Sequence, residues 1–536
     1  KEGDGGNYYF LGVAGGASTI YHSGSAKLAT TATGIDVTGI ASADQLNSKN
    51  GKLFLDDNGS HNGVINAPAS LFINFDSDNT SAGEGVVFAY DRDGPSGGTS
   101  VVTINSTGID VTGTAVTDGL TVAGNVSVDG GTIKLDGNYP VGSQNVALGD
   151  AALDALTGGS YNTAIGANSL TENTSGDLNV AVGSGSLGGN TTGVQNSAFG
   201  TGVMVSNTTG SYNTAVGRGT LANNTSASNN TAVGYQSLFS SATASYNTAV
   251  GYQAGFSNTT GLLVALGYQA GYANTTGDNV AVRRLSLSSN TTGTNNVSVG
   301  TDALQNNTSA SNNTAVGYQA GYSNTTGTQN ILLGYQAGYA ATGSYMTAVG
   351  YQAGYNNQDA AVGNSFFGYA AGIGNTTGVA NNAFGQASFY QNTTGSYNTA
   401  MGSGSLQNNT TASNNTAVGY QAGYSNVSGE ENVTLGAQAS YISSQAKYLT
   451  AVGYQAAYSL GNAWSNTAIG HTALRSTTTG EFNVAVGRQA LYSNTTASNN
   501  TAVGYQAAKN TTTGTSNTAV GSLALISNTT GDENVA

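Results

Sequence analysis

Apolar and polar residues alternate in one short phrase that recurs along most of the chain. From Asn145 onward the phrase contains Asn, then Thr or Val, then Ala, then an aliphatic residue or Phe, then Gly, and it returns every 17 residues. We number each copy from its Asn, which is position 1, so that the Gly is position 5. The alternation predicts a short β-strand in each copy, and the fixed period predicts a solenoid whose coils pack only against their neighbours.

The period is regular enough to set the fold class. Position 1 is Asn in 21 of the 24 copies from Asn145 to Asn534, and Leu263, Met346 and Leu449 are the exceptions. The spacing shortens to 16 or lengthens to 18 in a few copies, where we expect irregular coils. No segment shows the apolar period of an amphipathic helix. The sequence therefore predicts an all-β chain dominated by a parallel β-roll or β-helix solenoid with 17-residue coils.

The two faces of the repeated strand differ in side-chain size, and neither carries charge. Positions 2 and 4 share one face and position 3 lies on the other, because strand side chains alternate. We expect Val or Ile at position 4 to fill the core of its own coil with the Leu of position 9, from a second strand. The small Ala of position 3 should then pack outward, against identical chains about a threefold axis. The alanines expected at this trimer contact are Ala181, Ala215, Ala249, Ala417 and Ala502, and the larger Leu332 and Phe366 are expected where the chains stand further apart.

Residues 1–144 show a different pattern, with short alternating strands bounded by Asp, Asn and Gly. The phrase Thr-Gly-Ile-Asp-Val-Thr-Gly occurs at Thr33–Gly39 and again at Thr107–Gly113, which indicates a duplicated element. Further strands are expected at Ser70–Phe75 and Gly85–Tyr90. We therefore divide the chain into a β module over residues 1–50, a second β module over 51–118, a β shaft or linker over 119–144, and the solenoid over 145–536.

Charge is scarce along the whole chain. Charged residues make up 7% of it, against roughly 25% in ordinary soluble domains. The formal net charge of −14 predicts no nucleic-acid partner. Gly, Asn, Ser and Thr dominate, as in disordered chains, but the aliphatic residues and Tyr recur at fixed phase, which favours a folded repeat. No apolar run approaches the roughly 20 residues of a membrane-spanning helix, so we expect no membrane insertion.

The repeat resembles two families of elongated proteins. Asn313–Gly327, with the sequence Asn-Thr-Ala-Val-Gly-Tyr-Gln-Ala-Gly-Tyr-Ser-Asn-Thr-Thr-Gly, is similar to arrays in phage tail-fibre-like proteins. Its Asn-x-Ala-Val-Gly part resembles the repeats of trimeric autotransporter adhesin heads, which form left-handed parallel β-rolls. The resemblance covers about 390 of the 536 residues. The stretch Thr107–Asp150 also resembles shaft regions of marine phage fibres. The period of 17 is longer than that of the adhesin heads, so the coil cross-section is expected to differ.

The resemblance implies a homotrimeric extracellular fibre, most simply a phage tail fibre or another virion appendage. Its partners are then its own copies, other virion proteins, and a host surface glycan or receptor. A trimeric adhesin on a bacterial cell surface is the main alternative. A glycan depolymerase of the tailspike kind is a third, less favoured one. We expect no enzymatic activity and no cofactor.

Tyrosines recur at positions 6 and 10, and stacked coils would align them at about 4.8 Å as ladders. Such ladders have two candidate roles. They could form an aromatic strip that contacts a glycan or receptor, or they could stabilise the solenoid as cross-strand aromatic pairs do, which we favour. The position-6 tyrosines that we assign to a candidate contact surface are Tyr235, Tyr252, Tyr268, Tyr318, Tyr335, Tyr351, Tyr420, Tyr454 and Tyr505.

The asparagine and threonine columns each allow a structural and a functional interpretation. The asparagines could form internal amide ladders, or glycosylation acceptors in sequons such as Asn207-Thr208-Thr209, and we favour the ladders. Asn-Thr-Thr-Gly is expected to form turns in which Asn or Gly takes positive φ. Ice binding would need a flat, outward Thr-x-Thr array. We expect instead that Thr163, Thr214 and Thr231 are buried.

Catalysis and metal binding have little support. The chain has no Cys, and its three histidines are far apart in sequence: His22, His61 and His471. Neighbouring acids do not by themselves provide the roughly 5–9.5 Å separation of a glycosidase pair. Asp76 and Asp78 form a weak calcium candidate, since their segment lacks the Gly and distal Glu of a full calcium loop. We therefore predict no catalytic residue.

Overall fold

The structure is a computed structural model, which describes residues 8–11, 19–22, 25–31, 34–37, 85–90, 99–105, 108–110, 142–358 and 363–536. These residues form β-strands and turns, and none of them belongs to a helix. Accordingly, no helix in the described ranges could cross a membrane. The chain divides into two compact units, Lys1–Ser127 and Val128–Ala536.

The first unit contains two antiparallel sheets. Each strand pairs with the next one along the chain. The strands are β1 (Tyr8–Leu11), β2 (Thr19–His22), β3 (Ser25–Thr31) and β4 (Gly34–Val37) in one sheet, and β5 (Gly85–Tyr90), β6 (Thr99–Asn105) and β7 (Gly108–Asp110) in the other. The expected strand at Gly85–Tyr90 is confirmed as β5, and Ser70–Phe75 lies outside the described residues. The duplicated Gly-Ile-Asp phrase forms the last strand of each sheet.

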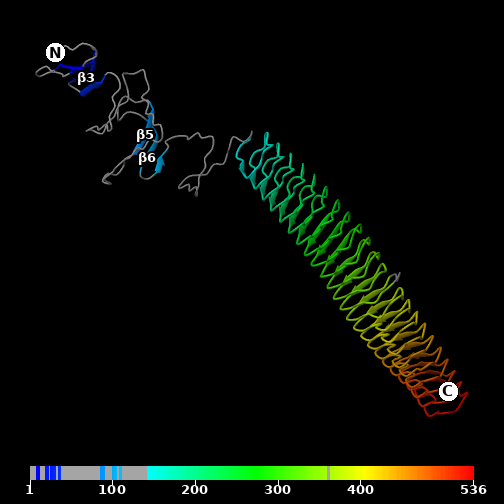
Figure 1. The fold of residues 1–536 in the computed structure, drawn as a ribbon. Helices are drawn as coiled ribbons and strands as arrows, with labels where there is room; N and C mark the ends of the chain where they lie inside the picture. Colours follow the sequence, from blue (N-terminus) through cyan, green and yellow to red (C-terminus); the bar gives the residue numbers. More distant parts are fainter. Residues whose placement is uncertain are drawn as a thin grey trace, which may run out of the picture. The chain divides into compact units, whose positions relative to one another are not determined.

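The second unit is a parallel β-solenoid, as predicted (Figure 1). Each coil has one short strand, and position 9 lies in a turn, not in the second strand from which we expected it to complete the core. Its strands are β8 (Val146–Leu148), β9 (Thr163–Ile165), β10 (Val180–Val182), β11 (Ser197–Phe199), β12 (Thr214–Val216), β13 (Thr231–Val233), β14 (Thr248–Val250), β15 (Leu263–Leu266), β16 (Asn279–Val282), β17 (Asn296–Val299), β18 (Thr314–Val316), β19 (Ile331–Leu333), β20 (Thr347–Val349), β21 (Ser365–Phe367), β22 (Asn382–Phe384), β23 (Thr399–Met401), β24 (Thr416–Val418), β25 (Val433–Leu435), β26 (Thr450–Val452), β27 (Thr467–Ile469), β28 (Val484–Val486), β29 (Thr501–Val503) and β30 (Thr518–Val520).

Each solenoid strand pairs in parallel with the strand of the next coil, position by position, from β8 to β30. Ala181, for example, pairs with Ala198. Backbone hydrogen bonds also join the coils outside the strands. Leu187 N–H donates to the Val203 carbonyl at 2.9 Å, and Thr191 N–H donates to the Thr208 carbonyl at 2.9 Å. Neighbouring coils are therefore bonded on several sides of the solenoid.

The core lies on the opposite side of the strand from the one that we expected. The position-3 alanines assigned to a trimer contact are all fully buried within their own chain: Ala181, Ala215, Ala249, Ala417 and Ala502. They cannot touch another chain, and that assignment is wrong. The physical reason is that position 9 faces the position-3 methyl inside the coil: a Cβ added at Gly423 would lie 3.7 Å from the Ala417 Cβ. A coil of 17 residues encloses a narrow interior, which Leu at position 9 and Ala at position 3 fill together.

Large residues at position 3 are accommodated inside the coil and do not mark wider spacing between chains. Leu332 and Phe366 are both fully buried. Glycine stands at position 9 of the coils that pack against them. A Cβ added at Gly354 or Gly372 would come within 2.9 Å or 2.5 Å of the Phe366 ring. In these coils a glycine at position 9 therefore compensates for a large residue at position 3.

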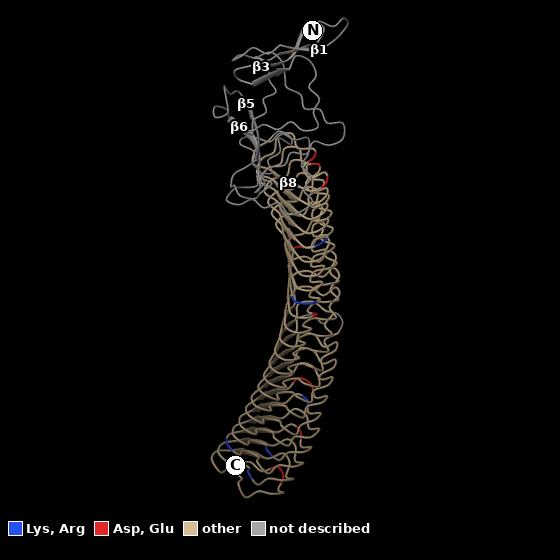
Figure 2. Cartoon of the chain, turned by 60° about the vertical axis from the view of Figure 1, so that its left-hand side comes forward, with Lys and Arg blue, Asp and Glu red and all other residues tan. Residues whose placement is uncertain are grey.

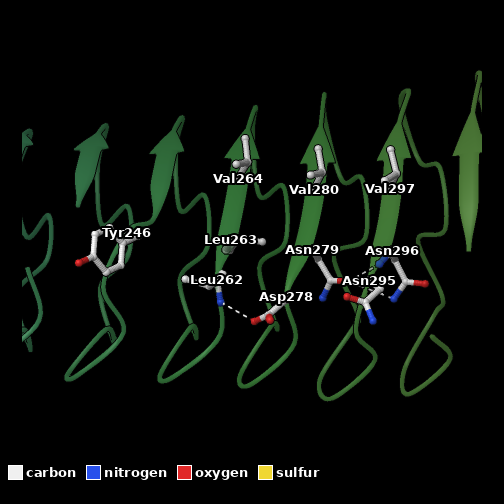
Figure 3. A pocket seen from close by; sticks show the side chains of 10 residues that line it. All are labelled: Tyr246, Leu262, Leu263, Val264, Asp278, Asn279, Val280, Asn295, Asn296 and Val297. Atoms are coloured by element: carbon white, nitrogen blue, oxygen red, sulfur yellow. Dashed lines mark hydrogen bonds between the residues drawn. The ribbon is translucent and has the colours of Figure 1, made fainter. Parts of the chain in front are cut away.

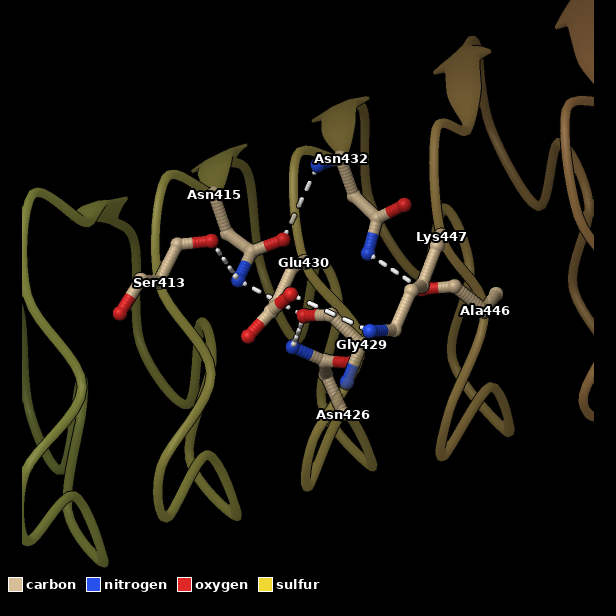
Figure 4. A network of polar contacts seen from close by, with 8 residues as sticks. All are labelled: Ser413, Asn415, Asn426, Gly429, Glu430, Asn432, Ala446 and Lys447. Carbon is tan, nitrogen blue, oxygen red and sulfur yellow. Dashed lines mark hydrogen bonds and ion pairs between the residues drawn. The ribbon is translucent and has the colours of Figure 1, made fainter.

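Two columns of asparagines, at positions 1 and 12, run inside the solenoid (Figure 4). Asn432 N–H donates to Asn415 Oδ1 of the previous coil at 3.0 Å. Asn415 Nδ2 and Asn426 Nδ2 both donate to the Gly429 carbonyl, each at 2.9 Å. Position 15 thus receives one hydrogen bond from each column. The internal amide ladder is confirmed, and it satisfies polar groups that burial would otherwise destabilise.

The Asn-Thr-Thr-Gly turn uses its glycine differently from our expectation. Glycines at position 15, such as Gly193, do not take positive φ. A Cβ at Gly193 would overlap Asn190 Oδ1 and the Gly210 carbonyl oxygen, so glycine relieves crowding in this coil. Other coils nevertheless carry Ala at position 15, such as Ala227. The sequon residue Asn207 is fully buried and donates to Asn190 Oδ1 at 2.7 Å, so its side chain belongs to the ladder.

Candidate functional site

The outer face of the solenoid sheet is the most extended feature of the described surface. We call the side chains at positions 2 and 4 of β8–β30 the outer sheet face. Position 4 is Val, Ile, Leu, Phe or Met in all 23 strands, position 2 is Thr in 12 of them, and neither position holds a charged residue. Phe199, Val250 and Met401 are 42%, 39% and 44% exposed. Extended exposed apolar surface of this kind is typical of a protein interface.

The position-2 threonines lie on this face, so our expectation that they are buried is wrong. Thr214 and Thr231 are exposed, and Thr163 is half-buried. The outward pair is nevertheless Thr-x-Val, because position 4 is apolar in every strand from β8 to β30. These strands therefore lack the paired threonines that an ice-binding array requires.

Six of the nine tyrosines singled out at position 6 come together in two ladders. The ladders are Tyr235–Tyr252–Tyr268 and Tyr318–Tyr335–Tyr351, the second of which continues to Tyr369. Neighbouring ring centroids lie 5.0 to 5.2 Å apart, with interplanar angles of 5° to 19°. An inner ring thus has another ring on each face and presents its edge and hydroxyl group to solvent. This arrangement supports stacking between coils and leaves no open ring face there for a sugar.

The other three position-6 tyrosines lie apart from these ladders. They are Tyr420, Tyr454 and Tyr505, which are 55%, 47% and 45% exposed. Tyr454 stacks on His471 of the next coil with ring centroids 5.2 Å apart. Their assignment to a contact surface stays a prediction.

Position 10 carries further aromatic ladders. The rings of Tyr322, Tyr339 and Tyr355 stack with centroids 5.1 and 4.9 Å apart. Burial raises the pKa of the Tyr339 phenol, and its neighbours in the ladder raise it further, as does Tyr318 of position 6. The columns at positions 6 and 10 are therefore close enough to interact.

Arginines occupy four points of these columns, and three of them contact a tyrosine ring, which our sequence analysis missed. The Arg218 guanidinium lies 6.0 Å from the Tyr235 ring centroid at one end of a ladder. Arg475, at position 10, lies 4.9 Å from the Tyr458 centroid. The Arg488 guanidinium lies 6.0 Å from the centroid of the Tyr505 ring in the next coil. Cation–π contact explains why an arginine fits here, and the phase of each arginine in the repeat could have revealed it.

The coils with 16-residue spacing open a hollow of about 470 Å³ on the outer sheet face (Figure 3). Its apolar lining includes Tyr246, Leu262, Val264, Val280 and Val297. Asp278 is the one charged lining residue, and its carboxylate accepts the Leu262 N–H at 2.8 Å. The hollow suits an apolar group and brings no nucleophile or base together.

Charged residues are few and are spread along the solenoid (Figure 2). Among the described residues, ion pairs join coils at Arg284 with Asp302, at 3.3 Å, and at Lys447 with Glu430, at 3.1 Å; Figure 4 shows the second pair. In the described ranges no group of three or more His, Asp and Glu residues could hold a metal ion. The weak calcium candidates Asp76 and Asp78 lie outside those ranges. The chain matches no family model, no curated protein and no solved structure.

Proposed function

We propose that this chain is a structural part of an extracellular fibre, in which the solenoid is a stiff spacer and three identical chains associate through the outer sheet face. The observation that carries the proposal is that this face is uncharged from β8 to β30, that its position-4 side chains are all apolar, and that the chain itself leaves the face half-buried to exposed. Apolar surface is driven out of water, so a partner that covers the face would stabilise the assembly.

A second copy of the chain is the partner that fits the face best. The 23 strands define 22 intervals, which at about 4.8 Å each give a length of about 105 Å, and three strand residues give a width of about 10 Å. The face thus covers on the order of 1,000 Å², against about 800 Å² per partner in a stable interface. An identical chain also has the same axial period, so it can match the face at every coil.

The number of chains and the location rest on the resemblance of Asn313–Gly327 to fibre and adhesin repeats. A phage tail fibre or virion appendage, bound to other virion proteins, is the first candidate. A bacterial surface adhesin is the second, and an anchor domain in the full-length protein would favour it. We favour a spacer over a receptor-binding tip, because such tips usually use irregular loops and this array has few. Contact with a host glycan through the tyrosine edges and hydroxyls is a secondary proposal.

The test is the mass of the full chain in solution, compared with that of a variant whose face is charged. We expect three times the 53.4 kDa chain mass for the wild type. Val216→Lys, Val250→Lys and Val316→Lys together place three charges on a face where each valine is 37 to 39% exposed, and should yield monomers that keep the β spectrum. The control adds the same charges at exposed position-14 residues of the turns: Thr209→Lys, Thr260→Lys and Thr326→Lys. A monomeric wild type would contradict the proposal, as would a control that dissociates equally.

A further inference from the structure

We propose that the stacked tyrosines are sites of oxidative cross-linking, at which dityrosine joins neighbouring coils when a one-electron oxidant is present. The clearest block lies between Tyr318 and Tyr369. It contains five stacked tyrosine pairs. At position 6 these are Tyr318 with Tyr335, Tyr335 with Tyr351, and Tyr351 with Tyr369. At position 10 they are Tyr322 with Tyr339 and Tyr339 with Tyr355. The inference concerns contacts within one chain and is independent of how many chains associate.

The geometry holds the two rings of each pair next to each other. Ring centroids in this block are 4.9 to 5.2 Å apart, and the rings are nearly parallel. The position-6 rings are also reachable from solvent, since Tyr335 and Tyr369 are 43% and 56% exposed. A radical formed on one ring therefore has a second tyrosine beside it before any other partner diffuses in.

The chemistry balances with a peroxidase and hydrogen peroxide as the oxidant. Each phenol gives one electron to the oxidant and one proton to water and becomes a phenoxyl radical. A carbon–carbon bond forms between the two ring carbons ortho to oxygen, and the hydrogens on those carbons move to the phenol oxygens. The two electrons and two protons reduce one hydrogen peroxide to two waters. Each link thus removes two hydrogen atoms from the protein and ties two coils covalently.

The chain contains its own control for exposure. Tyrosines at position 17 are more exposed than every ladder tyrosine except Tyr369, but none of them stacks on another tyrosine. Tyr212, Tyr246 and Tyr397 are 55%, 71% and 63% exposed. The residues at position 17 on either side of Tyr212 are Gln195 and Asn229. If exposure alone directed oxidation, these tyrosines would react first.

The experiment treats the full chain with peroxidase and limiting hydrogen peroxide, then measures dityrosine fluorescence, intact mass and linked peptides. We expect losses of two hydrogens per link and peptides that join adjacent coils, such as Tyr335 with Tyr351. A mixture of ¹⁴N- and ¹⁵N-labelled chains should give linked peptides of a single label. Mostly mixed-label links would overturn the inference, because they would place the coupling between chains.

Phenylalanine variants test the role of stacking without removing the rings. Tyr335→Phe with Tyr339→Phe eliminates four of the five pairs in the block, so links there should fall to the single pair 351–369. The matched control, Tyr212→Phe with Tyr246→Phe, should leave the links of the block unchanged. Equal loss in both variants would overturn the inference. So would oxidation confined to position 17, or oxygen addition without any link.

Discussion

Position 9 takes the left-handed backbone conformation in coils that carry leucine there and in coils that carry glycine. Leu304 has a φ of 46°, and Gly372 has a φ of 59°. This conformation costs a non-glycine residue about 1–2 kcal/mol. Leucine is retained because its side chain fills the core beside a small residue at position 3. Glycine takes the place where another large side chain already fills the core, as beside Phe366.

The compensation predicts strong coupling between these two positions. Phe366→Ala should lower the free energy of unfolding by about 3–5 kcal/mol, because it leaves a cavity. Gly372→Leu alone should also destabilise, because its side chain would overlap the Phe366 ring. The double variant should recover at least about 1 kcal/mol of the summed loss in a denaturant-unfolding cycle. Purely additive losses would show that positions 3 and 9 do not share the core.

Alkaline pH should destabilise the aromatic ladders. Burial raises the pKa of the Tyr339 phenol above its usual value of 10.0, and the phenol of Tyr441 shows the same shift. A raised pKa in the folded state means that the unfolded chain loses these protons first. The contribution of these phenols to the free energy of unfolding is therefore complete below about pH 10, and it disappears as the pH rises through their pKa in the folded state. Urea midpoints should fall steadily above pH 10, and Tyr339→Phe should make the fall shallower. A midpoint that stays constant to about pH 11 would contradict this prediction.

At the scale of the element, the coil that starts at Asn279 departs most from the pattern. Arg283 occupies position 5, where the other described coils have glycine with φ between 120° and 149°. The φ of Arg283 is 94°, in a region that L-residues avoid. Such a residue stores about 1–3 kcal/mol of backbone strain. The coils around the hollow thus combine a strained backbone with a shortened spacing.

Replacing this arginine with glycine should stabilise the chain. Arg283→Gly relieves the strain, so we expect the free energy of unfolding to rise by about 1 kcal/mol. The control is Arg488→Gly, at position 6, which has no such backbone strain and gives up a cation–π contact with Tyr505. It should therefore destabilise. Urea unfolding of both variants checks the prediction. A loss of stability in both would show that the contacts of Arg283 stabilise the chain by more than its backbone strain costs.

The strands were predictable from the sequence, and their orientation was not. The repeat around β24 shows alternating side chains, a turn sequence and a fixed period. These three features together predict the parallel solenoid and the length of its coil. Thr416 and Val418 on one face and Ala417 on the other all lack charge, so alternation alone does not show which face is buried. The buried face is decided by how the side-chain volumes at positions 3 and 9 fit together. These two positions lie in different parts of the coil. The tyrosine columns were predictable because the tyrosines recur at the same positions of the repeat. The hollow was not, because it depends on how three irregular coils pack together.

At the scale of the whole molecule, the solenoid unit is built for length. Each coil bonds only to its neighbours, through the strand, the turns and the asparagine ladders. Stability of such an array is approximately a sum over coils and their contacts, so length can grow without a larger core. An axial load is shared by backbone hydrogen bonds on several sides of every coil. These properties suit the spacer function that we propose.

Electron cryo-microscopy of the full chain is the most direct test of that account. For the 22 intervals between β8 and β30 we expect a rod about 105–110 Å long. In cross-section three chains should surround a common axis, with positions 2 and 4 turned toward it and the tyrosine ladders away from the axis. Single solenoids whose outer sheet face is bare, or an assembly joined through the tyrosine columns, would contradict the account.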